Sequence, residues 1–423
     1  MGRFSPVVQA PRYLKEFQCV GSACPESCCT GWQVAIDKST YQRYQTVKTE
    51  PLASLMRLHV EKTQTGVRDS DTFAKIKLGL GESCPFLDEA SLCRIQTHLG
   101  AAALSRTCAE YPRIYLRDGT RPGLAATLSC PEAAKLALAR EDALDMVDVT
   151  LDFANPSLVP VRRQRSEPAT TESDLVRKHA VLVGQVIESL VRSPQLSAAQ
   201  ALVYSGLLLR RIGGLAKLPM AEAEAGLAQT LNEYLSPSRL TQVPTLIRGL
   251  DVPKAVQMDL MQGALQRYHH DQKGAQGVRP SFLKLLIEVF DGLQLNQAGP
   301  REASLALYCQ AETEFFQPSE QAYPHALKNY LLNALTGGLF PREGADGLDE
   351  EFMSLALRFG LIKFLLIGLA AKEQRVLNLD DYSRVAFVVA RNIEHNRRFM
   401  PEVLQSLQAH DALRLEVLAT LVA

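Results

Sequence analysis

The cysteines are the residues of this sequence whose type and spacing point most clearly to chemistry. Nine cysteines occur in 423 residues, and eight of them lie within the first 130. Four fall close together in the run Cys19-x4-Cys24-x3-Cys28-Cys29, and the others are Cys84, Cys93, Cys108 and Cys130. In a reducing compartment this clustering favours metal binding or redox chemistry over disulfides. Thiolates are soft ligands that suit zinc or an iron–sulfur cluster.

The spacing of these eight cysteines helps to decide which metal they bind. Structural zinc sites usually contain C-x2-C pairs, and the sequence has none. We therefore predict an iron–sulfur cluster of the 4Fe–4S kind, with zinc as the alternative. One cluster takes about four protein thiolates, so the remaining cysteines must bind a second ion, react, or pack as small buried hydrophobic residues. Packing is the interpretation that we apply to Cys309, which lies in an apolar helical stretch.

Composition and charge limit the class of protein. Hydrophobic residues make up 46% and charged residues 22%, as in an ordinary globular protein, and 46 Lys and Arg balance 46 Asp and Glu. A neutral chain argues against nucleic-acid binding through overall charge. The N-terminus lacks a signal-peptide pattern, and Arg358 and Lys363 interrupt the apolar stretch at 355–371, which predicts a buried helix. We expect a cytoplasmic protein with no membrane partner.

The elements that must position the cysteines differ between the two halves of the chain. Residues 1–155 form a cysteine-rich part, with short strands predicted at 33–36 and 72–80 and helices predicted from Asp37 or Ser39 to Val47 and over 129–143. A polar, proline-containing linker is predicted at 156–172. Residues 173–423 show helical periodicity throughout. The predicted fold is mainly α, with an irregular metal-binding N-terminal part packed on an α-helical C-terminal domain.

The helices expected in the second half are marked by apolar periodicity, by prolines at their starts and by a capping box from Ser197 to Gln200. They are predicted at 198–211, 219–235, 253–270, 281–293, 301–316, 323–336, 350–372, 380–398 and 400–422. The pair Gly213–Gly214 follows a helical run rather than a strand, and no alternating βαβ pattern is visible. We therefore expect no Rossmann-type methyltransferase sheet.

Several segments resemble one known family. The run FQCVGSACPESCCTGWQVAIDKSTYQRY is similar to the opening of the flagellin lysine N-methylases, which are relatives of cysteine-rich putative zinc- or iron-chelating proteins. CPFLDEASLCRIQTHLG, LSRTCAEYPR and LSCPEAAKLAL resemble the later cysteine blocks of the family, in order, and all eight N-terminal cysteines fall on family cysteine positions. KNYLLNALTGGLFP and ARNIEHNRRF extend the resemblance toward the C-terminus.

The resemblance implies a protein-lysine N-methyltransferase that transfers methyl groups from S-adenosylmethionine to lysine side chains of flagellin. It also implies an iron–sulfur centre held by the cysteines. A metal-chelating or metal-delivery protein, in which the helical part is a non-catalytic interaction module, is the alternative. The sequence indicates neither the oligomeric state nor the choice between polar and radical methyl transfer.

Residues beside the cysteines are candidates for the cofactor site. Trp32, the only tryptophan, would form one wall of that site, although core packing also explains it. Tyr111 and Arg113 follow Cys108, and Arg113 suits the carboxylate of S-adenosylmethionine, although a surface salt bridge explains it equally. The acceptor lysine must lose its proton before it attacks, and Asp37 and Tyr111 lie close enough in sequence to help.

A polar stripe is predicted on the helix at 380–398. Arg384, Arg391 and His395 recur at intervals of seven and four residues, so they share one face. We interpret this stripe as a solvated helix face, with a polar functional site as the alternative.

Overall fold

The computed structural model describes residues 7–32, 34–63, 72–79, 83–119, 121–151, 163–165, 168, 173–250, 252–272, 279–297, 300–396, 399–408 and 415–422. The chain forms two compact units. The cysteine unit comprises residues 17–114 and 130–132, and the helical unit comprises 1–16, 115–129 and 133–423. This division differs from the boundary at 155 that the sequence suggested, and most of the predicted linker lies outside the described residues.

The helices and strands of the cysteine unit are short. They are the 3-10 turn η1 (Gly21–Ala23), β2 (Ala35–Ile36), α2 (Lys38–Gln45), α3 (Leu52–His59), β3 (Val60–Lys62), β4 (Ala74–Ile76), α4 (Arg94–Leu99), the 3-10 turn η3 (Ala101–Ala103) and α5 (Arg106–Glu110). The central strand β4 pairs antiparallel with β2 and β3. The helix opened by Asp37 is thus confirmed, and the predicted strand at 72–80 is found as the shorter β4, with residue 80 outside the described residues.

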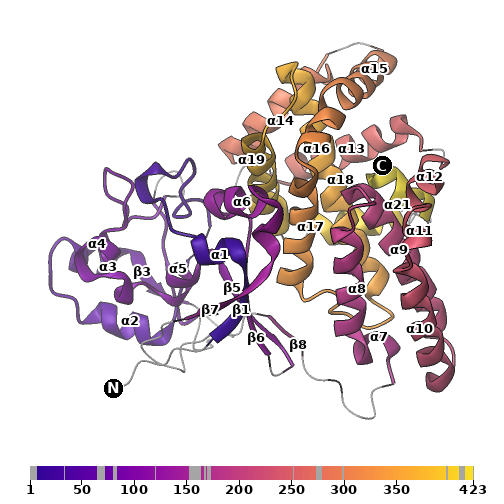
Figure 1. The fold of residues 1–423 in the computed structure, drawn as a ribbon. Coiled ribbons are helices and arrows are strands. Elements are labelled where there is room, and N and C mark those ends of the chain that lie inside the picture. The colour runs from indigo at the N-terminus through magenta and orange to yellow at the C-terminus, as the bar shows by residue number, and fades with distance from the viewer. Residues whose placement is uncertain are drawn as a thin grey trace. The chain divides into compact units, whose positions relative to one another are not determined.

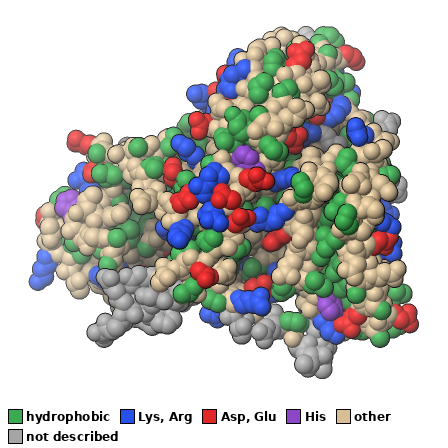
Figure 2. Space-filling view, viewed as in Figure 1, with side chains coloured by type: hydrophobic (Ala, Val, Ile, Leu, Met, Phe, Trp, Pro, Cys, Tyr) green, Lys and Arg blue, Asp and Glu red, His purple; other side chains and the backbone are tan. Residues whose placement is uncertain are grey.

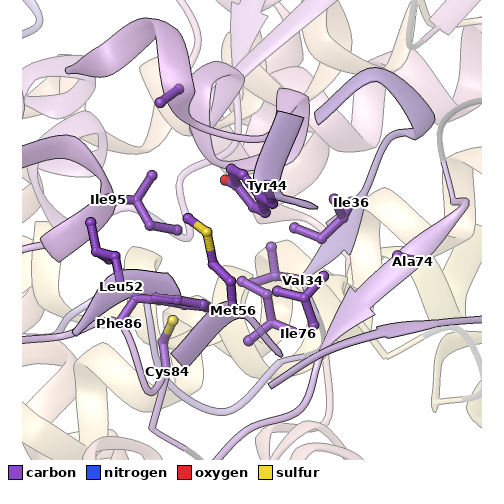
Figure 3. Close-up of a cluster of buried hydrophobic side chains, with 12 residues drawn as sticks. Val34, Ile36, Tyr44, Leu52, Met56, Ala74, Ile76, Cys84, Phe86 and Ile95 are labelled. Carbon is purple, nitrogen blue, oxygen red and sulfur yellow. The ribbon is translucent and has the colours of Figure 1, made fainter. Parts of the chain in front are cut away.

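A small apolar core holds these pieces together. Figure 3 shows Met56 of α3, Ile76 of β4 and Phe86 gathered around one centre, together with the thiol of Cys84. Each of these side chains is at most 8% exposed. One of the predicted metal-binding cysteines is therefore also part of the core of its unit.

The helical unit contains a five-stranded mixed sheet that the sequence analysis did not predict. Its strands are β1 (Val7–Pro11), β5 (Arg113–Asp118), β6 (Arg121–Ala126), β7 (Met146–Thr150) and β8 (Arg163–Arg165), in the order β7-β1-β6-β5-β8. β1 pairs parallel with β6 and antiparallel with β7. These pairings place the N-terminal segment and residues 115–129 in the helical unit. The sheet is mixed rather than parallel and doubly wound.

The rest of the helical unit is α-helical. Its described helices are α1 (Arg12–Glu16), α6 (Pro131–Leu138), the 3-10 turn η4 (Glu141–Leu144), α7 (Leu175–Lys178), α8 (Ala180–Arg192), α9 (Ala198–Leu215), α10 (Met220–Tyr234), α11 (Pro237–Leu240), α12 (Val243–Arg248), α13 (Lys254–Gln272), α14 (Pro280–Gly292), α15 (Arg301–Ala311), α16 (Gln317–Ala322), α17 (Pro324–Gly338), α18 (Leu348–Glu373), α19 (Leu379–Val389), α20 (Phe399–Gln408) and α21 (Leu415–Val422). π-helical turns follow α15 at Glu312–Phe316 and α19 at Ala390–Glu394. Ser197 and Gln200 form the predicted capping box of α9.

Helix α18 is the centre of the helical unit. It packs against α9, α14, α15, α19 and α21, and Figure 1 shows α8, α9, α17 and α18 side by side. Among the described residues, α18 is the one helix long and apolar enough to cross a membrane, but 89% of its apolar window is buried inside the protein. Its composition therefore fits a core helix, as the sequence suggested.

Charged side chains of both signs mingle on the face drawn in Figure 2. Ion pairs also occur among the exposed side chains of the helical unit: Arg140 lies 2.9 Å from Glu16, and Arg192 lies 3.0 Å from Asp145. These side chains are 38–49% exposed, so each pair contributes at most about 1 kcal/mol.

The predicted solvated stripe on the helix at 380–398 was wrong for one of its three residues, Arg391, which is 6% exposed. Arg384 is half-buried and His395 is exposed, with its Nε2 2.9 Å from the Ser129 hydroxyl. Residues 385–393 are all buried, so this part of the helix has no solvated face and Arg391 is buried with its neighbours.

Candidate functional site

The eight N-terminal cysteines line a single cavity of about 370 Å³. Every described residue around this cavity belongs to the cysteine unit. The thiols come from the loop at 19–29, from the segments around Cys84 and Cys93, from α5 and from the start of α6. Cys309 lies on α15 in the helical unit and is not among the lining residues. Cys19 and Cys130, which are 111 positions apart in sequence, therefore line the same cavity, as residues of one site must.

The loop at 19–29 is held in place by local hydrogen bonds. Gly21 adopts a positive φ of 56°, which opens the turn η1, and the Cys24 thiol donates to the backbone carbonyl of Glu26 at 3.2 Å. The backbone N–H of Cys84 donates to the carbonyl of Cys29 at 2.8 Å. That bond brings the segment of Cys84 to the loop.

A buried carboxylate joins α2 to α5, the helix that carries Cys108. One oxygen of Asp37 accepts from the Ser39 hydroxyl at 2.6 Å and from the Thr40 N–H at 2.9 Å, and the other accepts from the Arg106 N–H at 3.1 Å. Burial alone would raise the pKa of Asp37, but these hydrogen bonds outweigh it and lower the pKa to about 2. Ser105 caps α5 by accepting from the N–H of Cys108.

Electrostatics pick out four of the cysteines as close neighbours. Burial raises the pKa of the Cys84 thiol to about 12, and charge on Cys108, Cys93 or Cys28 would raise it further. Burial likewise raises the pKa of Cys108 to about 11, and charge on Cys93 or Cys28 again adds to the rise. The thiols of Cys84 and Cys108 are thus protonated at neutral pH, and an incoming metal must displace these protons.

The donor set around the cavity fits a thiophilic metal centre in chemistry. Eight thiols from several segments of the chain line one cavity, and thiolates are soft ligands that suit such metals. Among the described residues, however, no three His, Cys, Asp or Glu side chains are gathered at metal-binding distance. The structure therefore brings the ligand candidates together without assembling a coordination sphere.

The three predicted cofactor-site residues also line this cavity. The rings of Trp32 and Tyr111 lie 6.0 Å apart, tilted by 38°, and the indole N–H donates to the carbonyl of Cys28. The Arg113 guanidinium lies 5.0 Å from the centre of the Phe17 ring in a cation–π contact. Trp32 also packs against the core of the unit, so its packing role and its place in the cavity wall are compatible.

Tyr111 and Asp37, the two residues considered as helpers of lysine deprotonation, differ in their position relative to the cavity. Tyr111 lines the cavity, whereas Asp37 does not and uses its oxygens within the fold. Sequence reasoning missed several polar residues of the lining, among them Glu26, Tyr44 and Glu132. Glu26 and Glu132 each lie two residues after a cysteine, and that proximity was the available signal.

Comparisons with known proteins agree on one family. The model of the FliB lysine N-methylase C-terminal domain matches residues 185–421. The lysine-N-methylases of Salmonella choleraesuis strain SC-B67 and Salmonella typhimurium strain LT2 are each 24% identical over 418 residues, which cover 95% of this chain and 94% of theirs. The flagellar biosynthetic protein FliU of Salmonella muenchen is 33% identical over 162 residues, covering 38% of this chain and 93% of FliU. No solved structure matches the chain.

Proposed function

Since the chain belongs to the FliB lysine N-methylase family, we propose that it methylates lysine side chains of flagellin with S-adenosylmethionine as the methyl donor. Lysine methylation follows from the family. The donor, the flagellin substrate, the cytoplasmic location and an iron–sulfur cluster are the parts that we propose. The observation that best supports the donor and the cluster is the cavity of the cysteine unit, where eight thiols meet the rings of Trp32 and Tyr111 and the guanidinium group of Arg113.

Four cysteines are the proposed cluster ligands: Cys28, Cys84, Cys93 and Cys108. Their charges affect one another, and one cluster takes about four thiolates. When bound, the cluster would supply a redox-active or structural centre. The protein's contribution is a buried, largely apolar surround, which excludes water from the sulfur atoms and tunes their chemistry. Cys19, Cys24, Cys29 and Cys130 remain candidates for a second ion or for structural roles.

The methyl donor and the lysine would use other parts of the cavity lining. Arg113 suits the carboxylate of S-adenosylmethionine, and Trp32 and Tyr111 would form the wall beside it. The lysine amine, with an ordinary pKa of about 10.4, must be neutral to accept a methyl group. The ammonium group must therefore lose its proton after the lysine is bound and before the methyl group is transferred.

We expect flagellin to gain the mass of one or more methyl groups when it is incubated with the anaerobically prepared protein and S-adenosylmethionine. Mass spectrometry of flagellin peptides measures the modification and its lysines. Omission of S-adenosylmethionine is the control. An unmodified flagellin, with metal-loaded protein present, would instead support a metal-chelating or metal-delivery role.

We also expect the protein to be brown when it is purified without oxygen and to lose its colour in air. Iron–sulfur clusters absorb visible light, and oxygen that reaches the cavity would oxidise the cluster. The measurement is iron and acid-labile sulfide per chain. Stoichiometric zinc with neither iron nor sulfide would contradict the cluster while leaving a thiolate metal site.

A further inference from the structure

Glu132 is a charged residue of the cavity lining that takes no part in the proposed cluster or donor site. The charged residues among the described lining are Glu26, Arg113 and Glu132. The Arg113 guanidinium lies over the Phe17 ring, and the backbone carbonyl of Glu26 accepts a hydrogen bond from the Cys24 thiol. The Glu132 side chain makes no hydrogen bond or ion pair with any described residue.

Glu132 lies in the first turn of α6, two residues after Cys130, and is half-buried. A negative charge at that place interacts favourably with the helix dipole. Most of the other lining residues are apolar or carry thiols. A carboxylate facing such a surround binds a cation more strongly than one in open water, because the surround weakens screening.

We propose that Glu132 binds the side-chain ammonium group of the lysine that is to be methylated. This inference rests on the proposed function, which supplies lysine as the substrate. The lysine side chain pairs a methylene stem with a cationic head, and the lining offers for them an apolar wall and a carboxylate that has no partner among the described residues. Arg113 has the opposite preference and repels the ammonium group. The two side chains thus suit different ligands: Glu132 the acceptor lysine and Arg113 the carboxylate of the donor.

Binding of two matched peptides to the full-length protein tests this assignment. One peptide carries a single lysine, and the other carries norleucine, which keeps the stem but lacks the amine. By isothermal titration calorimetry the wild-type protein should prefer the lysine peptide by about 10- to 100-fold, as expected for a charge-assisted hydrogen bond in a partly buried site. Glu132→Gln should abolish that preference and leave the affinity for the norleucine peptide unchanged.

Two further variants control for charge and folding. Glu302→Gln removes another first-turn glutamate, on α15 of the helical unit, and should keep the preference. Glu132→Asp retains the charge on a shorter side chain and should keep part of the preference, even if Glu132→Gln proves less stable. In the methylation assay, Glu132→Gln should raise KM for flagellin about 10-fold or more and leave KM for S-adenosylmethionine unchanged.

Two results would overturn the inference. An unchanged lysine preference in Glu132→Gln would leave the carboxylate with only its helix-terminus role. A raised KM for S-adenosylmethionine, with KM for flagellin unchanged, would assign Glu132 to the donor. Failure of the wild-type protein to methylate would refute the proposed function instead. Wild-type methylation with an unaffected Glu132→Gln variant would refute only the role of Glu132.

Discussion

Cys84→Ser should cost the protein its iron and its methyltransferase activity together, with activity falling below detection. Cys84 is 8% exposed, belongs to the core of the cysteine unit and lies beside three other candidate ligands. A serine hydroxyl is a poor ligand for iron in a cluster. The new hydroxyl would also be buried in an apolar core that offers it no dedicated hydrogen-bond partner. Iron content, methyl incorporation and melting temperature, measured on one preparation, report the three consequences.

Cys28→Ser separates loss of the metal from loss of the core. Cys28 is only half-buried and lies outside the hydrophobic core, so its replacement should remove the metal with a smaller effect on the metal-free fold. Because a bound metal adds its binding free energy to folding, the metal-loaded wild type should melt well above the Cys28→Ser protein. Full activity in a Cys28→Ser protein without metal would break the link between cluster and methylation.

Cys309→Ser is the matched control for both variants. Cys309 is half-buried on α15, far along the chain from the other cysteines and outside the cavity lining. The substitution should cost on the order of 1 kcal/mol or less in stability and leave iron and activity in place. Equal loss of activity with the metal retained would show that the helical unit contributes to the reaction through this residue.

The helices were predictable from the sequence because their signals are local. The capping box from Ser197 to Gln200 and prolines such as Pro280 and Pro324 mark the starts of α9, α14 and α17 within a residue or two. The burial of Arg391 was not predictable in this way. Residues 385–393 are all buried, and the helices packed against α19 include α14 and α17, which come from segments distant in sequence that no local pattern records.

The strands of the five-stranded sheet were missed for a different reason. β5 carries three charged residues in six, and β6 begins with Arg-Pro-Gly, so neither shows the alternation that identifies a half-buried strand. The pairing of β6 with β1 joins segments more than a hundred residues apart, which no local pattern records. The division into units depends on that pairing, so the boundary at 155 could not have been corrected from local signals.

The candidate site shows the same contrast between residue type and position. Residue type and clustering were sufficient to select the eight cysteines, Trp32, Tyr111 and Arg113, and all of them line the cavity. The role of Asp37 depended on position. Its closeness to the cysteines suggested chemistry, but the fold directs its oxygens to Thr40 and Arg106. Glu132 was overlooked because a glutamate at a helix start is ordinary until its side chain is found beside a cavity.

Asp37→Asn should destabilise the cysteine unit by about 2 kcal/mol at neutral pH. Both carboxylate oxygens of Asp37 accept backbone N–H groups, one from Thr40 and the other from Arg106. An asparagine has a single side-chain oxygen, so its amide group must face one of these donors and leave it unsatisfied. Because that contact joins α2 to α5, the variant should also release metal more readily at Cys108.

The pH dependence of unfolding distinguishes this explanation from a general loss of packing. The pKa of Asp37 is about 2 in the folded protein, below its ordinary value of about 4. Its contribution is therefore fully present above pH 4 and is lost as the pH falls toward 2. The difference in unfolding free energy between the wild type and Asp37→Asn, measured with denaturant on metal-free protein, should shrink across that interval. Asp380→Asn, at an exposed position in the first turn of α19, should show no comparable difference at any pH. A destabilisation by Asp37→Asn that stays constant from pH 5 to pH 2 would mean that packing, and not the carboxylate, holds α2 to α5.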